Sequence, residues 1–375
     1  RPGSKSTDVL SWKHCRPRRP SATFQRSRRT QPASALEANV PRRSRVSLLA
    51  IASLDTLTCG FHQAASGKRL RPEVHAFASH LDAELAQLRE DLLQERAPEG
   101  KWTTFQIYDP KPRQILAPCF RDRVLHHALM LHVGPVLERA LVDDCYACRV
   151  GKGSLAAVRR AQHHLQRFPW FVKTDIRAYF ASIDHHRLGQ LLGRRLKDPA
   201  VLALCKRILA QRPGPQGRGL PIGALTSQHF ANTYLDGFDR FLLEQQRVCA
   251  MVRYMDDVVW WCQSSQQARQ TLQAARQYLC EERDLELKAD AYIGRSPQGL
   301  PFLGFRILGG SLRLSLRRRR RYRAARARWE SAFADGRIDA LQLQAGYAAA
   351  LGITAHARAA AWRRAELSRS PPLDA

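Results

Sequence analysis

The stretch RYMDDVVWW, residues 253–261, places two adjacent carboxylates inside an otherwise apolar run. The β-branched and aromatic residues on both sides of Asp256 and Asp257 predict two strands joined by a tight turn. The favoured hairpin turns use Asn-Gly or Asp-Gly, and two adjacent like charges cost free energy unless a cation offsets them. The stretch is therefore either a hairpin turn of unusual sequence or a hairpin that holds metal ions.

Another acidic residue lies in a similar apolar setting. Asp175 falls near the end of WFVKTD, residues 170–175, which reads as an apolar strand. A pair of Mg²⁺ ions about 3.5–4 Å apart needs carboxylates from at least two chain segments. Strands that present Asp175 beside Asp256 and Asp257 would supply them.

The charge of the chain indicates a polyanionic partner. Its 61 Lys and Arg residues exceed its 33 Asp and Glu residues, which gives a formal net charge of +28. The excess is densest in residues 1–45 and 310–375. Each phosphate that Arg or Lys neutralises releases counterions, so such an excess suits a nucleic acid. An Arg-rich surface that is only solvated is the alternative.

The cysteines and the apolar segments exclude several classes of protein. Nine scattered cysteines lack the spacing of a secreted disulfide scaffold, and the pair Cys145 and Cys148 has no convincing second pair for a zinc site. No apolar run is long enough to span a bilayer. We therefore expect a cytoplasmic protein with reduced cysteines and no membrane partner.

Hydrophobic periodicity predicts an alternation of helices and strands. We expect helices over 46–98, 122–141, 185–196, 226–244 and 266–284, strands over 105–119, 170–175, 248–263 and 301–307, a loop over 213–223, and more helix over 310–375. His126 and His127 have no partner at ligand spacing, so we expect them at the surface of their helix.

With these motifs in place, the sequence resembles the reverse transcriptases. YMDD, residues 254–257, is similar to their palm hairpin, and DIRAYF, residues 175–180, to the strand that bears the first metal ligand. The resemblance runs from about residue 61 to about residue 364 with several motifs in the family's order. It implies an α+β right-hand polymerase fold, with fingers and palm built from an antiparallel sheet with helices, and a helical basic thumb.

The resemblance also implies an order of domains along the chain. The expected segments are a disordered basic segment over 1–45, an N-terminal helical region over 46–100, fingers and palm over 101–309, and a basic helical thumb with a C-terminal tail over 310–375.

Within the family, the closer likeness is to the reverse transcriptases of diversity-generating retroelements. Segments such as GKRLRPEV, DDCYACRVGKGS and GLPIGALTSQHFANTYL are similar to theirs. Ile222 stands where most reverse transcriptases have Gln, and Gln228 follows Ser227. That group copies a template RNA into cDNA with errors at template adenines, and the cDNA diversifies a target gene. Ala224 departs from the usual Asn of that motif, which puts adenine-specific error in doubt.

The resemblance assigns roles to individual residues. Two Mg²⁺ ions, or Mn²⁺ in their place, would activate the primer 3′-hydroxyl and stabilise the leaving pyrophosphate. The implied catalytic residues are Asp175, Asp256, Asp257 and Lys288, and the implied metal site is Asp175, Ile176, Asp256 and Asp257. The implied nucleotide-binding residues are Arg113, Arg149, Lys152, Phe180, Ile222, Gly223 and Gln228. The implied nucleic-acid-binding residues are Arg317, Arg318, Arg319, Arg320 and Arg321.

Several of these residues also have a plainer reading. Phe180 would exclude a ribose 2′-hydroxyl, but a buried core aromatic predicts the same residue. Arg149 and Lys152 lie in a basic loop punctuated by Gly that would grip a triphosphate or only be solvated. Lys288 would protonate the pyrophosphate as a general acid, or would lie at the surface with its charge in water.

The resemblance suggests partners and leaves competing functions open. The implied partners are a template RNA and its RNA/DNA duplex, dNTPs, and a small basic accessory protein that forms an oligomer. One alternative is a related bacterial reverse transcriptase that serves phage defence. Another is an RNA-binding protein with a catalytically inactive polymerase fold, which the three intact carboxylates disfavour.

Overall fold

The computed structural model describes residues 44–108, 112–211 and 213–373, apart from the side chain of Arg113. The predicted basic segment over 1–45 lies almost entirely outside the described residues, as do residues 109–111 within the strands predicted over 105–119. The described residues all belong to one compact unit.

The first described region is helical, as the periodicity predicts. It contains α1 (Leu48–Ile51), α2 (Leu54–Ala65), α3 (Pro72–Ser79), α4 (Leu81–Leu93) and the longer α5 (Phe120–Ala140). Ser53 caps α2 by accepting a hydrogen bond from the Thr56 backbone N–H. The rings of Phe61, Phe77 and Phe120 pack together where α2, α3 and α5 meet.

A two-stranded hairpin connects α4 to α5. Strands β1 (Trp102–Tyr108) and β2 (Pro112–Pro118) pair antiparallel over their whole length, from Trp102 opposite Pro118 to Tyr108 opposite Pro112. Most of β1 is exposed, including Phe105 and Tyr108, so the hairpin has little core of its own. Its base is fixed by Trp102, whose Nε1 donates to the Gln211 carbonyl at 2.8 Å.

The centre of the fold is an antiparallel sheet in the order β4-β5-β3-β6. Its strands are β3 (Trp170–Asp175), β4 (Ala250–Tyr254), β5 (Asp257–Cys262) and β6 (Tyr292–Arg295). Val258 and Trp260 belong to one hydrophobic core, whereas Val259 and Trp261 belong to a second. Because side chains alternate between the faces of a strand, a sheet covered on both faces needs an unbroken apolar run, and VVWW is such a run.

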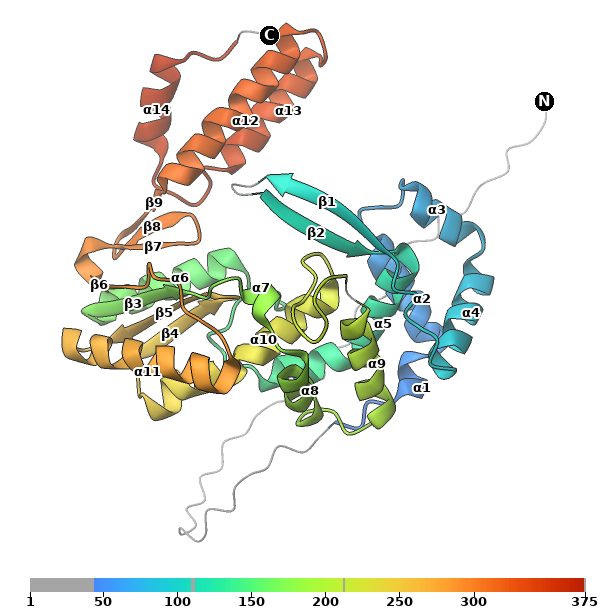
Figure 1. Cartoon of the computed structure of the whole chain (residues 1–375). Coiled ribbons are helices and arrows are strands. Elements are labelled where there is room, and N and C mark those ends of the chain that lie inside the picture. The colour runs from blue at the N-terminus through green and yellow to red at the C-terminus, as the bar shows by residue number, and fades with distance from the viewer. Residues whose placement is uncertain (1–43, 109–111, 212, 374–375) are drawn as a thin grey trace, which may run out of the picture. The chain divides into compact units, whose positions relative to one another are not determined.

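Helices cover one face of this sheet, and a helix with a small sheet covers the other. The helical elements after α5 are α6 (Ser154–Arg167), α7 (Tyr179–Ser182), α8 (His185–Gly193), α9 (Pro199–Ala210), α10 (Leu225–Arg240) with a π-helical extension (Phe241–Gln245), and α11 (Ser265–Arg283). Side chains of α10 and α11 share the core that contains Trp260, and those of α6 share the core that contains Trp261. Figure 1 shows α11 along one side of the sheet, and α6 with the small sheet over residues 300–314 along the other.

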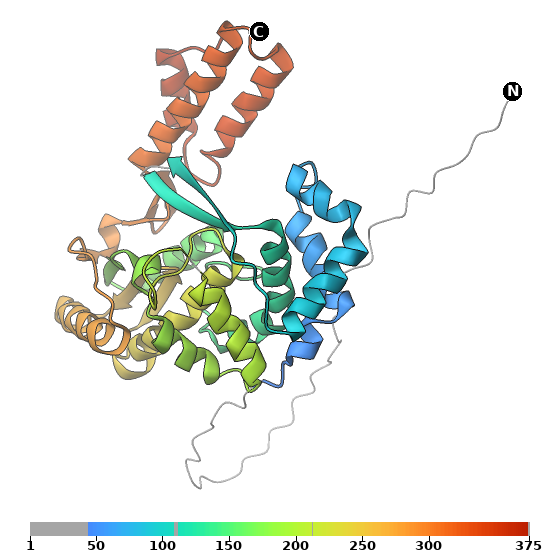
Figure 2. The same ribbon diagram turned by 45° about the vertical axis from the view of Figure 1, so that its right-hand side comes forward.

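The C-terminal region begins with a second small sheet and continues as three helices. Strands β7 (Leu300–Phe302), β8 (Phe305–Leu308) and β9 (Ser311–Leu314) precede α12 (Leu316–Ala334), α13 (Ala340–Gly352) and α14 (Ala360–Arg369). Strand β9 was not predicted, because the surrounding Arg- and Ala-rich composition favours helix. Figures 1 and 2 both show α12 and α13 side by side. The Tyr322 ring on α12 packs edge-on against Trp362 of α14.

The elements agree with the predicted fold class, because the chain is an α+β protein with antiparallel sheets and helices. The expectation for His126 is wrong, since its side chain is buried in α5 while His127 is only partly exposed. Within the part of the chain that the structure describes, no helix is both long and apolar enough to cross a bilayer.

Candidate active site

The three predicted carboxylates meet at one end of the central sheet. Asp175 is the last residue of β3 and Asp257 the first of β5, and the two are register partners across the antiparallel pair. Asp256 directly precedes Asp257 in the turn between β4 and β5. The sheet thus brings together residues that are about 80 positions apart in the chain.

The turn that presents Asp256 is a tight two-residue connection. Tyr254 pairs with Asp257, which leaves Met255 and Asp256 as the central residues. Met255 has φ of 57°, whereas Asp256 is not among the residues with positive φ. A positive φ at the first central residue alone is the pattern of a type II′ turn, in which Gly is preferred. The two alternatives considered for this stretch, a hairpin turn and a hairpin that holds metal ions, are therefore compatible.

The site concentrates negative charge in a partly desolvated place. Burial and, to a smaller extent, the nearby charge of Asp175 together raise the pKa of Asp256 to about 6. Burial also raises the pKa of Asp257 to about 6, against the opposing effect of Lys173. Both shifts mean that burial, together with the neighbouring carboxylates, disfavours the ionised forms, and that the nearby lysine does not fully offset this at Asp257.

Lysine side chains partly neutralise the carboxylates. Lys288 Nζ donates to Asp175 Oδ2 at 2.5 Å, and Lys173 Nζ lies 3.3 Å from Asp257 Oδ1. Burial alone would lower the pKa of Lys288, but its hydrogen bond to Asp175 and the charge of Asp256 raise it. Lys288 is placed beside the carboxylates by a backbone hydrogen bond from its N–H to the Asp175 carbonyl at 2.9 Å.

The residues present fit a divalent cation, although their side chains are not gathered around one. Among the described residues, no group of three or more His, Cys, Asp or Glu side chains is arranged as a metal site. Nevertheless, the buried Oδ1 of Asp175 accepts no hydrogen bond from any described group, and the buried Oδ1 of Asp257 has only its ion-pair contact with Lys173 Nζ at 3.3 Å. Carboxylate oxygens are the ligands that Mg²⁺ prefers, and a cation would pair with these oxygens and offset the repulsion between the carboxylates.

The loop before α10 lies against the β1–β2 hairpin. The Leu116 N–H donates to the Ile222 carbonyl at 2.9 Å. Gly223 has φ of +128°, and a Cβ there would lie 2.8 Å from the Leu116 carbonyl oxygen. Glycine is therefore required twice over at this position, by its backbone conformation and by the close approach of β2. Ala224 is buried at the start of α10 and offers no capping hydrogen bond.

The predicted triphosphate residues have contacts of their own. Arg149 Nη1 donates to the carbonyls of Val142 and Cys145, at 2.7 and 3.0 Å. Lys152 Nζ forms an ion pair with Asp143 at 2.7 Å. Both side chains thus order the loop over 142–153, and their contact with a nucleotide stays a prediction.

The other residues predicted to bind the nucleotide lie on several elements and differ in how exposed their side chains are. Phe180 in α7 is partly buried, with its ring centroid 5.7 Å from that of Tyr179. Ile222 is 38% exposed. Ile176, which the resemblance assigns to the metal site, is buried and forms an isolated bridge with Leu287, and its metal role stays a prediction. Gln228 lies partly buried in the first turns of α10. Arg113 belongs to β2, opposite Ile107, and its role also stays a prediction.

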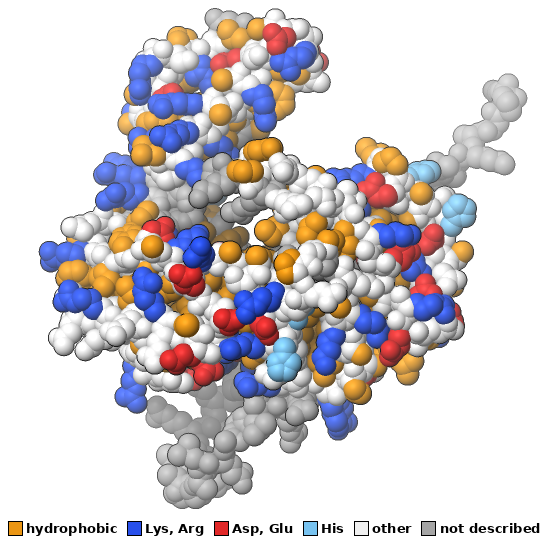
Figure 3. All heavy atoms as spheres, in the orientation of Figure 1, with side chains coloured by type: hydrophobic (Ala, Val, Ile, Leu, Met, Phe, Trp, Pro, Cys, Tyr) orange, Lys and Arg blue, Asp and Glu red, His pale blue; other side chains and the backbone are white. Residues whose placement is uncertain are grey.

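The Arg run at the start of α12 divides into two sets. Arg318 lies over the Phe305 ring at 3.9 Å, and Arg319 over the Trp362 ring at 5.5 Å, so these two stabilise local packing. Arg317, Arg320 and Arg321 are exposed. Figure 3 shows Lys and Arg side chains over the region of α12 to α14 and across the rest of that face, with acidic side chains between them.

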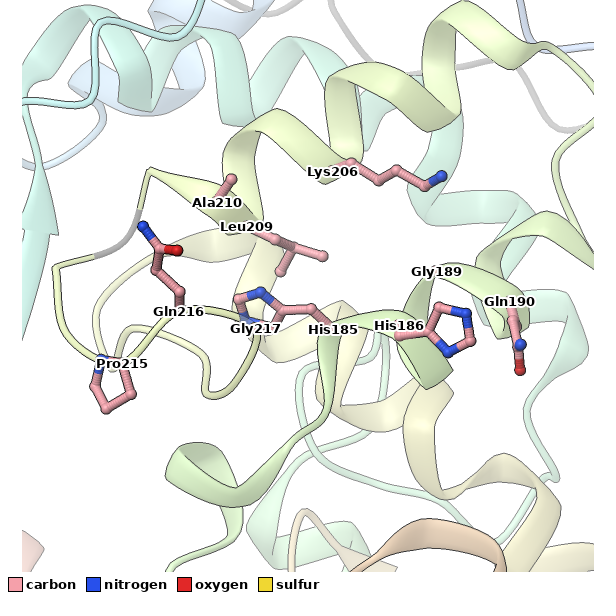
Figure 4. Close-up of a pocket in the computed structure, with 10 residues that line it drawn as sticks. All are labelled: His185, His186, Gly189, Gln190, Lys206, Leu209, Ala210, Pro215, Gln216 and Gly217. Carbon is pink, nitrogen blue, oxygen red and sulfur yellow. The ribbon is translucent and has the colours of Figure 1, made fainter.

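A pocket of about 700 Å³ lies away from the carboxylates, between α8, α9 and the loop before α10. Figure 4 shows the side chains that line it, none of which belongs to the carboxylate site. Its wall is ordered by His185, whose Nε2 lies 2.7 Å from the Gly219 carbonyl oxygen. The pocket is lined by His185, His186, Gly189, Gln190, Lys206, Leu209, Ala210, Pro215, Gln216 and Gly217.

Sequence reasoning missed the polar residues that support the carboxylate turn. Arg253 of β4 is fully buried and forms an ion pair with Asp239 of α10 at 2.6 Å. Burial raises the pKa of Asp239 to about 6, even though Arg253 opposes that rise. A signal was present in the sequence, because Arg253 is a charge inside an apolar strand, next to the motif.

Comparison with known proteins identifies the family. The family model described as reverse transcriptase (RNA-dependent DNA polymerase) matches residues 108–307, just over half of the chain. Protein YkfC of Escherichia coli K12 is 25% identical over 216 residues, which cover 52% of this chain and 53% of that protein. The group II intron-encoded protein LtrA of Lactococcus lactis subsp. cremoris is 26% identical over 140 residues, 36% of this chain and 23% of LtrA.

Among solved structures, an apo telomerase from Candida tropicalis, truncated from its C-terminal domain, aligns with a TM-score of 0.41 and 10% identity. The alignment covers 61% of this chain and 59% of that one. The chain spans about half or less of the length of these two curated relatives. On the match over residues 108–307, which contains all three carboxylates, the chain belongs to the reverse transcriptase (RNA-dependent DNA polymerase) family.

Proposed function

We propose that this protein is an RNA-directed DNA polymerase, which copies a template RNA into cDNA by two-metal nucleotidyl transfer. The observation that supports this best is the register of Asp175 and Asp257 beside Asp256, within a chain of this family. Carboxylates from two strands at one sheet edge can hold the cations that a nucleotidyl transfer needs.

Each residue of the site has a role in this proposal. Two bound Mg²⁺ ions would activate the primer 3′-hydroxyl and stabilise the departing pyrophosphate. Asp175, Asp256 and Asp257 would hold them, and the buried Oδ1 of Asp175 has no hydrogen bond from the described residues. Lys288, which is protonated beside Asp175, would give a proton to the pyrophosphate. Phe180 would exclude the 2′-hydroxyl of a ribonucleotide.

The remaining cationic residues would bind the nucleic acid and the nucleotide. Arg317, Arg320 and Arg321 are exposed at the start of α12, where phosphates of an RNA/DNA duplex could reach them. Arg113, Arg149 and Lys152 are proposed for the triphosphate of the dNTP. For Arg149 and Lys152, binding would require exchange of their present partners for phosphate oxygens.

Primer extension tests this function. The purified protein, a template RNA, an annealed DNA primer, dNTPs and Mg²⁺ should give extension products, and the variant Asp256→Ala/Asp257→Ala should give none. Equal incorporation by both proteins would refute the assignment of the carboxylates. No incorporation by the wild type, with candidate template RNAs and accessory proteins supplied, would refute the polymerase function.

We further propose that the enzyme is the error-prone polymerase of a diversity-generating retroelement. Ile222 and Gln228 support this, because they match the form of the motif in that group. Ile222 is 38% exposed beside Gly223 and cannot offer the hydrogen bonds that Gln offers at this place in other reverse transcriptases. A small basic accessory protein that forms an oligomer, together with a structured template RNA, would then be its partners.

Sequencing of the cDNA tests this narrower proposal. Substitutions should be concentrated opposite template adenines, and Ile222→Gln should reduce them. A uniform error rate at all four template bases would contradict the retroelement assignment while leaving the polymerase function intact. It would then favour a related bacterial reverse transcriptase, such as one that serves phage defence.

A further inference from the structure

A buried ion pair lies directly beneath the turn that presents Asp256. Arg253 is 0% exposed, and its Nε donates to the two carboxylate oxygens of Asp239 at 2.7 and 2.9 Å. Its Nη2 donates to Asp239 Oδ2 at 2.6 Å. This bidentate contact between a strand and α10 would be sufficient to pair the two charges.

The guanidinium has further acceptors that the ion pair does not need. Nη1 of Arg253 donates to Asn232 Oδ1 at 3.0 Å and to the Met255 carbonyl at 3.3 Å. Nη2 also donates to the Asn232 carbonyl at 3.3 Å. Each of the five N–H donors of the guanidinium therefore has an acceptor, a pattern that Lys with three donors cannot reproduce.

The contact with Met255 acts on the most strained residue of the turn. Met255 has φ of 57°, a region that costs a side-chain-bearing residue roughly 1 kcal/mol or more. Such a conformation persists only where its surroundings hold it. Arg253 holds the Met255 carbonyl, and the next residue along the chain is Asp256, so the guanidinium fixes the backbone that aims this carboxylate.

Asn232 extends the network to the basic loop over 142–153. Its Nδ2 donates to the Ala147 carbonyl at 2.8 Å, and the Cys145 thiol lies 3.5 Å from its Oδ1. The backbone of Arg253 joins the same loop, because the Tyr146 N–H donates to its carbonyl at 2.9 Å. One buried cluster thus contacts both the carboxylate turn and the loop that contains the predicted triphosphate residues.

We propose that Arg253, Asp239 and Asn232 are positioning residues that fix the carboxylate turn relative to the loop over 142–153. This inference rests on the proposed function. It adds the residues that hold the proposed metal-binding turn and the proposed triphosphate-binding loop in a fixed relative position. A buried ion pair is not required for stability as such, since apolar residues of similar volume often hold a core equally well. Geometry at the carboxylates should depend on this network more than stability does.

The double variant Arg253→Met/Asp239→Leu separates the two effects. It removes both buried charges together and keeps apolar volume, so its unfolding temperature should stay within about 5 °C of the wild type. Its kcat for primer extension should fall about 100-fold, and its half-maximal Mg²⁺ concentration should rise at least threefold. A simple loss of folded protein would lower kcat without shifting the Mg²⁺ dependence.

A binding measurement makes the test independent of turnover. Titration of the wild type with Mn²⁺, followed by the electron paramagnetic resonance signal of the free ion, should show binding that Asp256→Ala/Asp257→Ala abolishes. The double variant should bind Mn²⁺ at least threefold more weakly. If the wild type binds Mn²⁺ but extends no primer, the proposed function fails, and the positioning inference is still decided by this titration.

Two further variants serve as controls, one in case the double variant does not fold and one for the loss of an ion pair elsewhere on the helix. Arg253→Lys keeps one buried positive charge for Asp239 but loses donors for Asn232 and Met255, so it should shift the Mn²⁺ affinity in the same direction even if the double variant fails to fold. Arg240→Met removes an ion pair with Asp236 on the same helix, away from the turn, and should leave that affinity unchanged. Wild-type Mn²⁺ affinity and Mg²⁺ dependence in folded Arg253→Lys would overturn the proposal.

Discussion

Asp175 and Asp257 are register partners on neighbouring antiparallel strands, each at the end of its strand that borders the Met255–Asp256 turn. The buried Oδ1 of Asp175 has no hydrogen bond from the described residues, and the buried Oδ1 of Asp257 has only its ion-pair contact with Lys173. This pairing explains why two acidic motifs about 80 residues apart in the chain lie at one site. It also explains why that site would be stabilised by a bound cation.

Removal of one carboxylate should increase the free energy of unfolding and reduce the polymerase activity. The folded pKa of Asp256, about 6, exceeds its usual value of 3.8, so without metal the stability falls as the pH rises between these two values and the full penalty remains at higher pH. Asp256→Asn should therefore raise the free energy of unfolding by about 1–3 kcal/mol at pH 8 in EDTA. Primer extension should fall roughly a thousandfold, since several kcal/mol of charge stabilisation is lost.

Thermal unfolding in EDTA and single-turnover extension in Mg²⁺ would measure the two effects. Wild-type-like extension by Asp256→Asn would contradict the assigned metal role. If Asp256→Asn unfolded at a lower temperature than the wild type in EDTA, the destabilising effect inferred for the ionised Asp256 carboxylate would be contradicted.

The ring of Phe180 should govern the choice of sugar. Phe180 is partly buried in α7, close after the strand that ends at Asp175. Phe180→Ala should open space for a 2′-hydroxyl and reduce the preference for dNTP over rNTP, as a ratio of kcat/KM, by at least about tenfold, equivalent to 1.4 kcal/mol. An unchanged ratio would leave Phe180 as a core aromatic, the plainer reading of the sequence.

Gly223 should tolerate no side chain. A methyl group there would lie 2.8 Å from the Leu116 carbonyl oxygen, at a φ of +128°. Gly223→Ala should displace the loop from β2, raise KM for dNTPs, and cost about 1–3 kcal/mol of stability.

Gly217→Ala is a matched control for that variant. Gly217 also has positive φ, at +75°, but a Cβ there meets nothing within 4 Å. Its substitution imposes backbone strain without the clash, and KM should change little. A similar rise in KM for both variants would show that contact with β2 is not the cause.

Buried histidine should make the fold sensitive to acid. Burial lowers the pKa of His164 to about 4, and neither ring nitrogen has a hydrogen bond from the described residues. Unfolded His titrates near 6.5, so between these two values the unfolded state binds more protons and stability falls as the pH falls. At pH 5 the loss is about 2 kcal/mol for this residue.

The variant His164→Leu should flatten the decline in unfolding temperature between pH 7 and pH 5. His163→Leu, at an exposed position on the same helix, should leave the decline as it is in the wild type. Because the raised pKa values of Asp256 and Asp257 act with the opposite sign in all three proteins, the comparison isolates His164. Equal slopes for both variants would contradict the prediction.

The sequence by itself determined the elements and the acidic motifs. Periodicity predicted most helices and strands, because local hydrophobic spacing reports which face of an element is buried. An acid in an apolar strand predicted Asp175, Asp256 and Asp257, because a charge in such a place needs a specific reason. Composition failed where local propensity was overridden, as at β9, where pairing with β8 extends the strand structure into an Arg-rich segment.

Tertiary structure alone decided which residues face each other. The opposition of Asp175 and Asp257 depends on strand register, and the contact of Arg253 with Asp239, Asn232 and Met255 depends on how α10 packs beneath the sheet. The division of the Arg run into packed and exposed members likewise depends on where Phe305 and Trp362 lie. Distances between residues remote in the chain follow from packing of the whole core, which no local pattern encodes.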